Sequence, residues 1–395
     1  MLLVIAIIIG IPVFLRFIHS KNAEDDLKVG VPGPKGWPLL GSLLEVRPYI
    51  KDLKLYKILH QYHETFGDVI QLRLGPVKMI LSRDPKLTEA IVTNPKFGKS
   101  SEYKLFKDWS GENLVTMNGE KWQKMRKLMT PAFHFQILER FIPIFEEKTD
   151  IMIEIIEKHG AQSIELYPLL DNLTLDIISE TSMGVSLNAQ IDSHSPFIEA
   201  NHKLLNIFQE RLFSGYLTID WIFRLSPLYK EHRDSIKIVN EVVDKVIEQR
   251  REKLLTEKNN NFDVNSDSST KQRPALLDIL LQAQIDENPL TNENIRHEVI
   301  TFMFAGHEST AGTLFFTSYL IAKHPEVQQK LVKEIQMNSL DKDSHPLKIR
   351  DLNALPYMDN VIKEALRLYP PAIMNFKSCT EDSNILKSLM SKKKK

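Results

Sequence analysis

The feature that most constrains the fold is one long helical pattern, "NIRHEVITFMFAGHESTAGTLFFTSYLIAKHP". Thr291 is a suitable N-cap for this helix, Glu293 lies in its first turn, and Pro325 follows its end. A helix of this length crosses a whole domain. Helical patterns also dominate the rest of the chain, so we predict a mainly α fold with a small β-sheet region.

The middle of this helix, "AGHEST", does not suit a plain core segment. Ala305 and Gly306 are small, and Glu308, Ser309 and Thr310 are polar in a segment that should be buried. Glycine costs about 1 kcal/mol in a helix relative to alanine, and an unpaired buried carboxylate costs more. A flat ligand against the two small residues, with an acid and alcohols beside it to move protons, would explain both costs.

Two alternatives exist for this segment. It is either such a site or an ordinary core helix that bends at Gly306 and Gly312, with its Ser and Thr hydroxyls bonded to the preceding turn. A zinc site of the H-E-x-x-H kind is excluded, because Ala311 stands where the second histidine would be. We assign no metal ligand from the sequence.

Shorter elements surround the long helix. In "DVIQLRLGPVKMILSRDP", β-forming residues alternate with polar residues on both sides of Gly75-Pro76, which predicts a β-hairpin. We also predict a helix that ends at Gly160, another over "DSIKIVNEVVDKVIEQRREKLLTEK", and one that begins at Pro325. The polar segment from 256 to 274 predicts a surface loop, since helical patterning resumes directly after it.

A second candidate site lies in "GEKWQKMRKLMTPAFHF". Trp122 and Arg126 are four residues apart and so share one face of a helix that we expect to end at Pro131. An indole N–H and a guanidinium on one face are two donors suited to carboxylates. The alternative is a tryptophan packed on a basic surface helix.

A third candidate is the pair Glu364 and Arg367 in "PYMDNVIKEALRLYPP", a helix that ends at a double proline. The two residues are three apart, so their side chains lie on one helix face. Alone, this pattern is typical of a weak surface ion pair.

Overall charge and cysteine content exclude several classes of protein. Lysine plus arginine equals aspartate plus glutamate at 51 each, so no net field attracts nucleic acid, and we predict no nucleic-acid partner. Cys379 is the single cysteine, so no internal disulfide can form. This content suits a domain that faces a reducing compartment.

The N-terminus predicts a membrane anchor over residues 1–18. The segment is apolar from Leu2 to Leu15, and its length of roughly 27 Å just spans a hydrocarbon core. Basic residues follow it, which favours a cytosolic location for the rest of the chain. A cleaved signal peptide is the alternative, but there is no basic region before the apolar run. We expect residues 19–48 to form a basic, proline-rich hinge. Its segment "VGVPGPKGWPLLGSLLEV" should be neither helix nor central strand, because proline fixes φ and glycine frees it.

In this order, the features resemble a microsomal cytochrome P450. They are the anchor, the "PGPKGWPLLG" hinge, the early hairpin, "WQKMR", "AGHEST" and "KEALR" before the double proline. The phrases "TPAFHF", "TLDIISETSMGVSLNAQ" and "FMFAGHES" are most similar to the fatty-acid ω-hydroxylase branch, family four. The resemblance implies a partial P450 domain over 49–382 that acts on a lipophilic small-molecule substrate. It also implies NADPH–cytochrome P450 reductase and membrane lipid as partners, and the endoplasmic reticulum membrane as the location.

The resemblance also implies which residues bind haem. Trp122 and Arg126 would hold the haem propionates, and Ala305 and Gly306 would let the long helix pass over the porphyrin face. In the family-four branch the position of Ala305 is often a glutamate that forms an ester with the haem. Alanine cannot do this, so the resemblance implies a non-covalent haem.

Proton delivery and structural roles follow from the same resemblance. Glu308 and Ser309 match the family's acid–alcohol pair, in which the alcohol is usually a threonine, and Thr310 is the next residue. Ser309 keeps the hydroxyl but lacks the methyl group that restricts its rotamers. Glu364 and Arg367 match the family's structural helix pair.

The C-terminal region departs from the family pattern. The cysteine that binds haem iron in the family lies in a glycine-rich loop further along the chain, whereas Cys379 stands between Ser378 and Thr380. We therefore expect the axial cysteine ligand to be absent, and residues 383–395 to be a basic tail outside the family. Two hypotheses follow: a haem-thiolate monooxygenase, or a truncated, non-catalytic chain that is an interaction module or an incomplete gene product.

Overall fold

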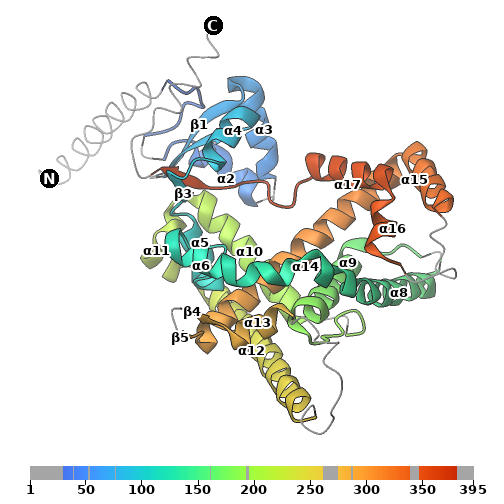
Figure 1. Cartoon of the computed structure of the whole chain (residues 1–395). Coiled ribbons are helices and arrows are strands. Elements are labelled where there is room, and N and C mark those ends of the chain that lie inside the picture. The colour runs from blue at the N-terminus through green and yellow to red at the C-terminus, as the bar shows by residue number, and fades with distance from the viewer. Residues whose placement is uncertain are drawn as a thin grey trace, which may run out of the picture. The chain divides into compact units, whose positions relative to one another are not determined.

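The computed structural model describes residues 30–379, except residues 39, 52–53, 76, 161, 193–194, 261–274, 286–287 and 339–346. Helices dominate this part of the chain, and its strands form small two-stranded sheets (Figure 1). The prediction of a mainly α fold with a small β region is confirmed. Among the described helices, none is both long and apolar enough to cross a membrane. The predicted anchor, residues 1–18, and the predicted tail, residues 383–395, lie outside the described residues.

The chain divides into two compact units, the first comprising residues 1–106, 203–234 and 376–395 and the second residues 107–202 and 235–375. The first contains α2 (Leu43–Lys51), α3 (Leu55–Phe66), β1 (Val69–Leu74), β2 (Val77–Ser82), α4 (Pro85–Val92), β3 (Phe97–Lys99), η4 (Tyr216–Thr218), α11 (Asp220–Arg224) and β6 (Lys377–Cys379). The helices that belong partly to each unit are α5 (Tyr103–Ser110), α10 (Pro196–Ser214) and α12 (Leu228–Asn260).

The second unit holds the long helix, α14 (Asn292–Lys323). Its other elements are α6 (Gly119–Met129), η1 (Thr130–Phe133), α7 (Phe135–Leu138), η2 (Glu139–Phe141), α8 (Ile142–His159), α9 (Leu166–Ile178), η3 (Ser179–Met183), α13 (Leu276–Gln282), β4 (Gln284–Ile285), β5 (Asn288–Pro289), α15 (Pro325–Met337), α16 (Ile349–Asn353) and α17 (Pro356–Leu368).

The hairpin of the first unit is confirmed, with β1 and β2 antiparallel and Leu74 opposite Val77. Residues 31–36 form neither helix nor strand, as expected for the proline-rich hinge, and the Gln71 amide donates to the Pro32 carbonyl at 2.8 Å. The expectation that the hinge is irregular throughout is wrong at its end, because α2 begins at Leu43. No glycine or proline lies between Ser42 and Arg47 to prevent a helix there.

Two further helix boundaries follow the sequence signals, and a third does not. Helix α8 ends at His159, and Gly160 has a φ of 59°, a conformation that glycine adopts without strain. Helix α15 begins with Pro325, as predicted. Helix α12 continues to Asn260, so the first residues of the predicted loop over 256–274 are helical, and the rest of that loop lies outside the described residues.

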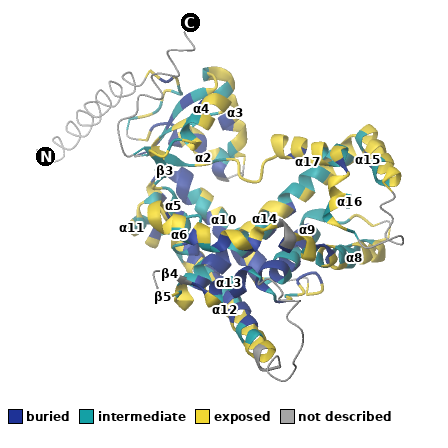
Figure 2. Cartoon of the chain, in the orientation of Figure 1, coloured by how far each residue is buried: buried dark blue, intermediate teal, exposed yellow. Residues whose placement is uncertain are grey.

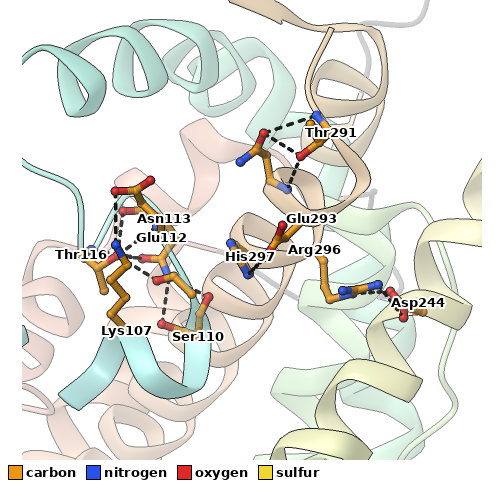
Figure 3. Close-up of polar contacts among 12 residues, drawn as sticks. Lys107, Ser110, Glu112, Asn113, Thr116, Asp244, Thr291, Glu293, Arg296 and His297 are labelled. Carbon is orange, nitrogen blue, oxygen red and sulfur yellow. Dashed lines mark hydrogen bonds and ion pairs between the residues drawn. The ribbon is translucent and has the colours of Figure 1, made fainter. Parts of the chain in front are cut away.

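Local contacts fix the start of α14 (Figure 3). The Thr291 hydroxyl accepts a hydrogen bond from the Asn294 amide at 3.1 Å, which confirms the predicted N-cap. One turn further on, Arg296 donates two hydrogen bonds to Asp244 of α12, at 2.6 and 2.9 Å. Buried positions lie along the first two thirds of α14, and its last third is more exposed (Figure 2).

Helix α14 packs on α9 at very short range. Leu170 and Leu173 of α9 form a buried cluster with Ala311 of α14. A methyl group added to Gly306 would lie 2.6 Å from both the Cγ1 and Cδ1 atoms of Ile178, closer than carbon atoms approach. Gly306 therefore lets α14 lie against α9, which is a packing reason for this glycine.

We predict that two glycines of α14 respond oppositely to alanine. Gly306→Ala should reduce the free energy of unfolding by about 1–3 kcal/mol, because Ile178 must move. Gly312→Ala is the matched control: no atom lies within 4 Å of its added methyl group, so alanine should stabilise the helix by up to about 1 kcal/mol. Urea unfolding measures both. Equal stabilisation by the two variants would contradict the packing role of Gly306.

A buried ion pair joins α12 to α13. Arg250 donates to both carboxylate oxygens of Asp278, at 2.6 and 2.9 Å, and the two side chains are only 10% and 5% exposed. The hydrogen bond with Asp278 is the main cause that raises the pKa of Arg250. Removal of either partner would leave an uncompensated charge in a nearly dry site.

This pair has a matched control on the surface. We predict that Arg250→Met lowers the free energy of unfolding by about 3–5 kcal/mol. Arg296→Met breaks a pair of the same geometry, but Arg296 and Asp244 are 31% and 48% exposed, so the loss should be about 1 kcal/mol or less. Urea unfolding of the two variants tests the difference, and equal losses would contradict it.

Candidate functional site

One face of α14 carries small side chains that are open to solvent. Ala305 and Ser309 are both exposed and lie one turn apart, on the same side of the helix as Phe302. The Ser309 hydroxyl donates to the Ala305 carbonyl at 2.6 Å, and the Thr313 hydroxyl donates to the Ser309 carbonyl at 2.8 Å. Both hydroxyls therefore donate to the preceding turn, as expected if the segment were an ordinary core helix. The face that carries them is exposed, however, so it is not part of the buried core. Thr310 is also exposed.

The second candidate pair lies on α6, in the same unit. Trp122 and Arg126 are both exposed there. The helix ends at Met129, two residues before the predicted stop at Pro131, which lies in the η1 turn. The last residue of η1, Phe133, stacks on Phe302 of α14, with 5.6 Å between ring centroids. The element that follows α6 thus contacts the α14 face that carries Ala305.

These residues fit one part of a haem group. Exposed indole and guanidinium donors suit the propionates, and the small side chains of Ala305 and Ser309 suit a flat ring. Cys379 does not fit the remaining part. It lies in strand β6, opposite Phe97 of β3, whereas a thiolate that binds iron needs surrounding backbone N–H donors in a loop.

Glu308 lies away from the open face, in a cluster with α9 and α10. The Tyr167 hydroxyl donates to its Oε1 atom at 3.1 Å. Its Oε2 atom lies 3.5 Å from Nε2 of His202 and 3.9 Å from Nε2 of His307. Asp171 joins them, with Oδ2 at 3.0 Å from His202 and Oδ1 at 3.7 Å from His307. We call these five residues the α9–α10–α14 cluster.

The pKa values in this cluster follow from burial and from close charges. The contact with Asp171, and then that with Glu308, raises the pKa of His202 to about 10. Burial lowers the pKa of His307. Burial acts to raise the pKa of Glu308, but the contacts with the two histidines and Tyr167 outweigh it, so the pKa is lowered. At neutral pH, Glu308 is therefore a carboxylate.

The sequence identified only Glu308 among these five residues. Asp171, His202 and Tyr167 belong to different helices from Glu308, and no local pattern connects them. His307 belongs to "GHEST", and the absence of a second histidine four residues later excludes only a zinc site of the H-E-x-x-H kind. Contacts between distant helices were needed to find the cluster.

The third candidate pair is formed as predicted. Arg367 of α17 donates to both carboxylate oxygens of Glu364, at 2.7 and 2.6 Å. Both side chains are mostly exposed, and the pairing raises the pKa of Arg367 and lowers that of Glu364. Close by in the chain, the Tyr369 ring stacks on Phe316 of α14, which holds this helix end against α14.

Comparison with known proteins shows the family of this chain. The cytochrome P450 family model matches residues 31–394. Cytochrome P450 4d2 of Drosophila melanogaster is 36% identical over 90% of this chain and 72% of its own length. Cytochrome P450 4d1 of the same species is 35% identical over 98% and 77%, and cytochrome P450 4c21 of Blattella germanica is 34% identical over 94% and 74%. The expected resemblance to family four is confirmed, and the chain belongs to the cytochrome P450 family.

Proposed function

We propose that this cytochrome P450 is a haem monooxygenase that hydroxylates fatty acids or other lipophilic small molecules. NADPH–cytochrome P450 reductase would supply the electrons. We place the protein at the endoplasmic reticulum membrane, held by an anchor at residues 1–18 and a hinge at 19–48, with the P450 domain over 49–382. The observation that supports this function best is the open face of α14, where exposed Ala305 and Ser309 lie on the same side as Phe302, which stacks on Phe133 of the element that follows α6.

In this proposal three residues of the second unit hold the haem without a covalent bond, and a fourth residue sets the position of the helix face. Trp122 and Arg126 bind the propionates, while Ala305 presents no side chain that would keep the ring away from α14. Gly306 acts indirectly, because it lets α14 lie against α9 and so sets the position of the open face. When bound, haem supplies the dioxygen chemistry.

Three residues of α14 would relay protons in the proposed reaction. The Ser309 hydroxyl now donates to the Ala305 carbonyl, so its proton becomes available only after the side chain rotates. The Glu308 carboxylate is held by Tyr167 and His202 and must leave them to serve Ser309. The exposed Thr310 hydroxyl is a further group that can relay a proton beside them.

The haem-binding role of α6 can be tested by haem content, which does not depend on turnover. We predict that Arg126→Leu weakens haem retention about tenfold, the effect of removing a charge-assisted hydrogen bond of about 1.5 kcal/mol. Lys127→Leu is the control, since Lys127 is the exposed neighbour on α6. Haem per chain is measured by pyridine haemochromogen absorbance after gel filtration. Equal haem content in the two variants, or none in the parent chain, would contradict the assignment.

A second candidate function is that of a non-catalytic P450 chain, an interaction module or an incomplete gene product. The position of Cys379 favours it: the residue lies in β6 with its neighbours paired to β3. A thiolate ligand pushes electron density onto iron and so favours O–O bond cleavage. A chain in which Cys379 cannot supply this ligand would be inactive as a monooxygenase.

We predict that the 395-residue chain, reduced under carbon monoxide, shows no thiolate-type Soret band. The reason is that the single cysteine is a strand residue without the glycine-rich loop that a thiolate ligand needs. Cys379→Ser should leave the spectrum unchanged. A thiolate-type band in the parent chain that is lost in Cys379→Ser would show that Cys379 binds the iron and would reject this candidate.

A further inference from the structure

The α9–α10–α14 cluster contains a second polar centre that the haem chemistry does not use. Within it, one nitrogen of His307 and one oxygen each of Asp171 and Glu308 lie within 4.8 Å of one another. We propose that these three residues bind a divalent transition-metal ion, with Zn²⁺ as the expected ion. This inference goes beyond the proposed monooxygenase function and does not depend on it.

The geometry is close to that of a metal site. Ligand atoms arranged tetrahedrally at about 2.0–2.1 Å from Zn²⁺ lie about 3.3 Å apart. His307 Nε2 lies 3.7 Å from Asp171 Oδ1 and 3.9 Å from Glu308 Oε2. Shifts of a few tenths of an ångström would therefore bring the three atoms into coordination distance. A nitrogen and two carboxylate oxygens favour Zn²⁺ over Ca²⁺ or Mg²⁺, which prefer oxygen ligands alone.

The orientation of His307 is already that of a metal ligand. Its Nδ1 atom lies 2.7 Å from the carbonyl oxygen of Met303, so Nδ1 carries the proton and donates it there. The other nitrogen, Nε2, then has a lone pair that points into the cluster. Metal-binding histidines characteristically donate their second N–H to a carbonyl or carboxylate in this way.

Burial makes the absence of a cation costly. The His307 side chain is 0% exposed and that of Asp171 is 2% exposed. His307 Nε2, Asp171 Oδ1 and Glu308 Oε2 are all buried, and none has a hydrogen-bond partner among the described residues. A buried acceptor without a donor costs about 1–3 kcal/mol, and two adjacent carboxylates repel each other as well. One divalent cation would satisfy all three atoms.

A protonated His202 is the competing explanation, and it satisfies only part of the cluster. Its Nε2 atom lies 3.0 Å from Oδ2 of Asp171 and 3.5 Å from Oε2 of Glu308. A proton on His202 therefore neutralises carboxylate charge but gives His307 Nε2 no donor. With the metal bound, His202 would instead hold Oδ2 of Asp171 and fix its orientation.

The surrounding helices hold the ligands in place and leave a path for the ion. The Thr174 hydroxyl of α9 lies 3.1 Å from the His307 carbonyl oxygen, to which it donates, so it ties the helix that carries Asp171 to the one that carries His307. His202 and Glu308 are partly exposed, so ions can reach the site from solvent. A preformed site with an entry path meets the conditions for metal binding.

The test measures bound metal directly. The full chain, purified on a tag without histidine, is equilibrated with Zn²⁺, passed through gel filtration in metal-free buffer and assayed for metal by mass spectrometry. We expect about one Zn²⁺ per chain in the parent protein and at least tenfold weaker binding in Asp171→Asn and His307→Gln. Circular dichroism checks that each variant folds. If His307→Gln does not fold, Asp171→Asn, which keeps the side-chain shape, suffices for the test.

A second histidine of the same segment supplies the matched control. His324 follows α14 and contacts one carboxylate, Glu326, at 3.2 Å on the surface, so His324→Gln should bind Zn²⁺ like the parent chain. No retained Zn²⁺ in the parent chain, or the same Zn²⁺ content in all folded variants, would overturn the proposal and leave an ion-pair cluster. Haem content and turnover do not enter this result, so it is independent of the test of the monooxygenase function.

Discussion

The close contact between α9 and α14 determines how the second unit is organised. Because Gly306 has no side chain, the two helices approach until Ile178 fills the space beside it. This approach also brings Thr174 within hydrogen-bonding distance of the His307 carbonyl. One side of α14 is then fixed against α9, and the opposite side, with Ala305 and Ser309, remains open. The open face to which we assign haem and the buried cluster thus lie on different sides of one helix whose position this contact sets.

The unit contains two buried charged groups that are stabilised in different ways. Arg250 and Asp278 match one positive charge to one negative charge through two short hydrogen bonds. Asp171 and Glu308 instead bring two carboxylates to one neutral imidazole, with His202 at the edge. A buried pair needs only its partner, whereas two like charges need an additional cation, either a proton on His202 or a metal ion.

Local signals in the sequence predicted much of the fold. The Thr291 cap, the helix end at Gly160 and the β1–β2 turn each depend on residues close together in the chain, so their physical causes are visible there. The resemblance to cytochrome P450 rested on motif order and was confirmed by the family comparisons.

Interactions between distant residues could not be predicted in the same way. Gly306 suggested a ligand against the helix. Instead, Ile178 occupies the space that a side chain at this position would fill, and nothing near Gly306 in the sequence indicates that contact. Asp171 and His202 belong to two other helices, and no sequence motif includes them. They meet Glu308 only because three helices converge, and the assignment of no metal ligand reflected that limit.

The position of Glu308 also limits how an acid–alcohol pair can work on this helix. Consecutive residues of an α-helix point about 100° apart, so Glu308 and Ser309 cannot both face the open side. Ser309 lies on that side, and Glu308 is bonded to Tyr167 on another. For the carboxylate to reach Ser309 it must give up the contacts that keep it ionised, including those with His202 and His307. A cation in the cluster would bind the carboxylate directly and hold it there. The same carboxylate would then be a structural ligand while the ion is bound and a mobile acid only after the ion has left.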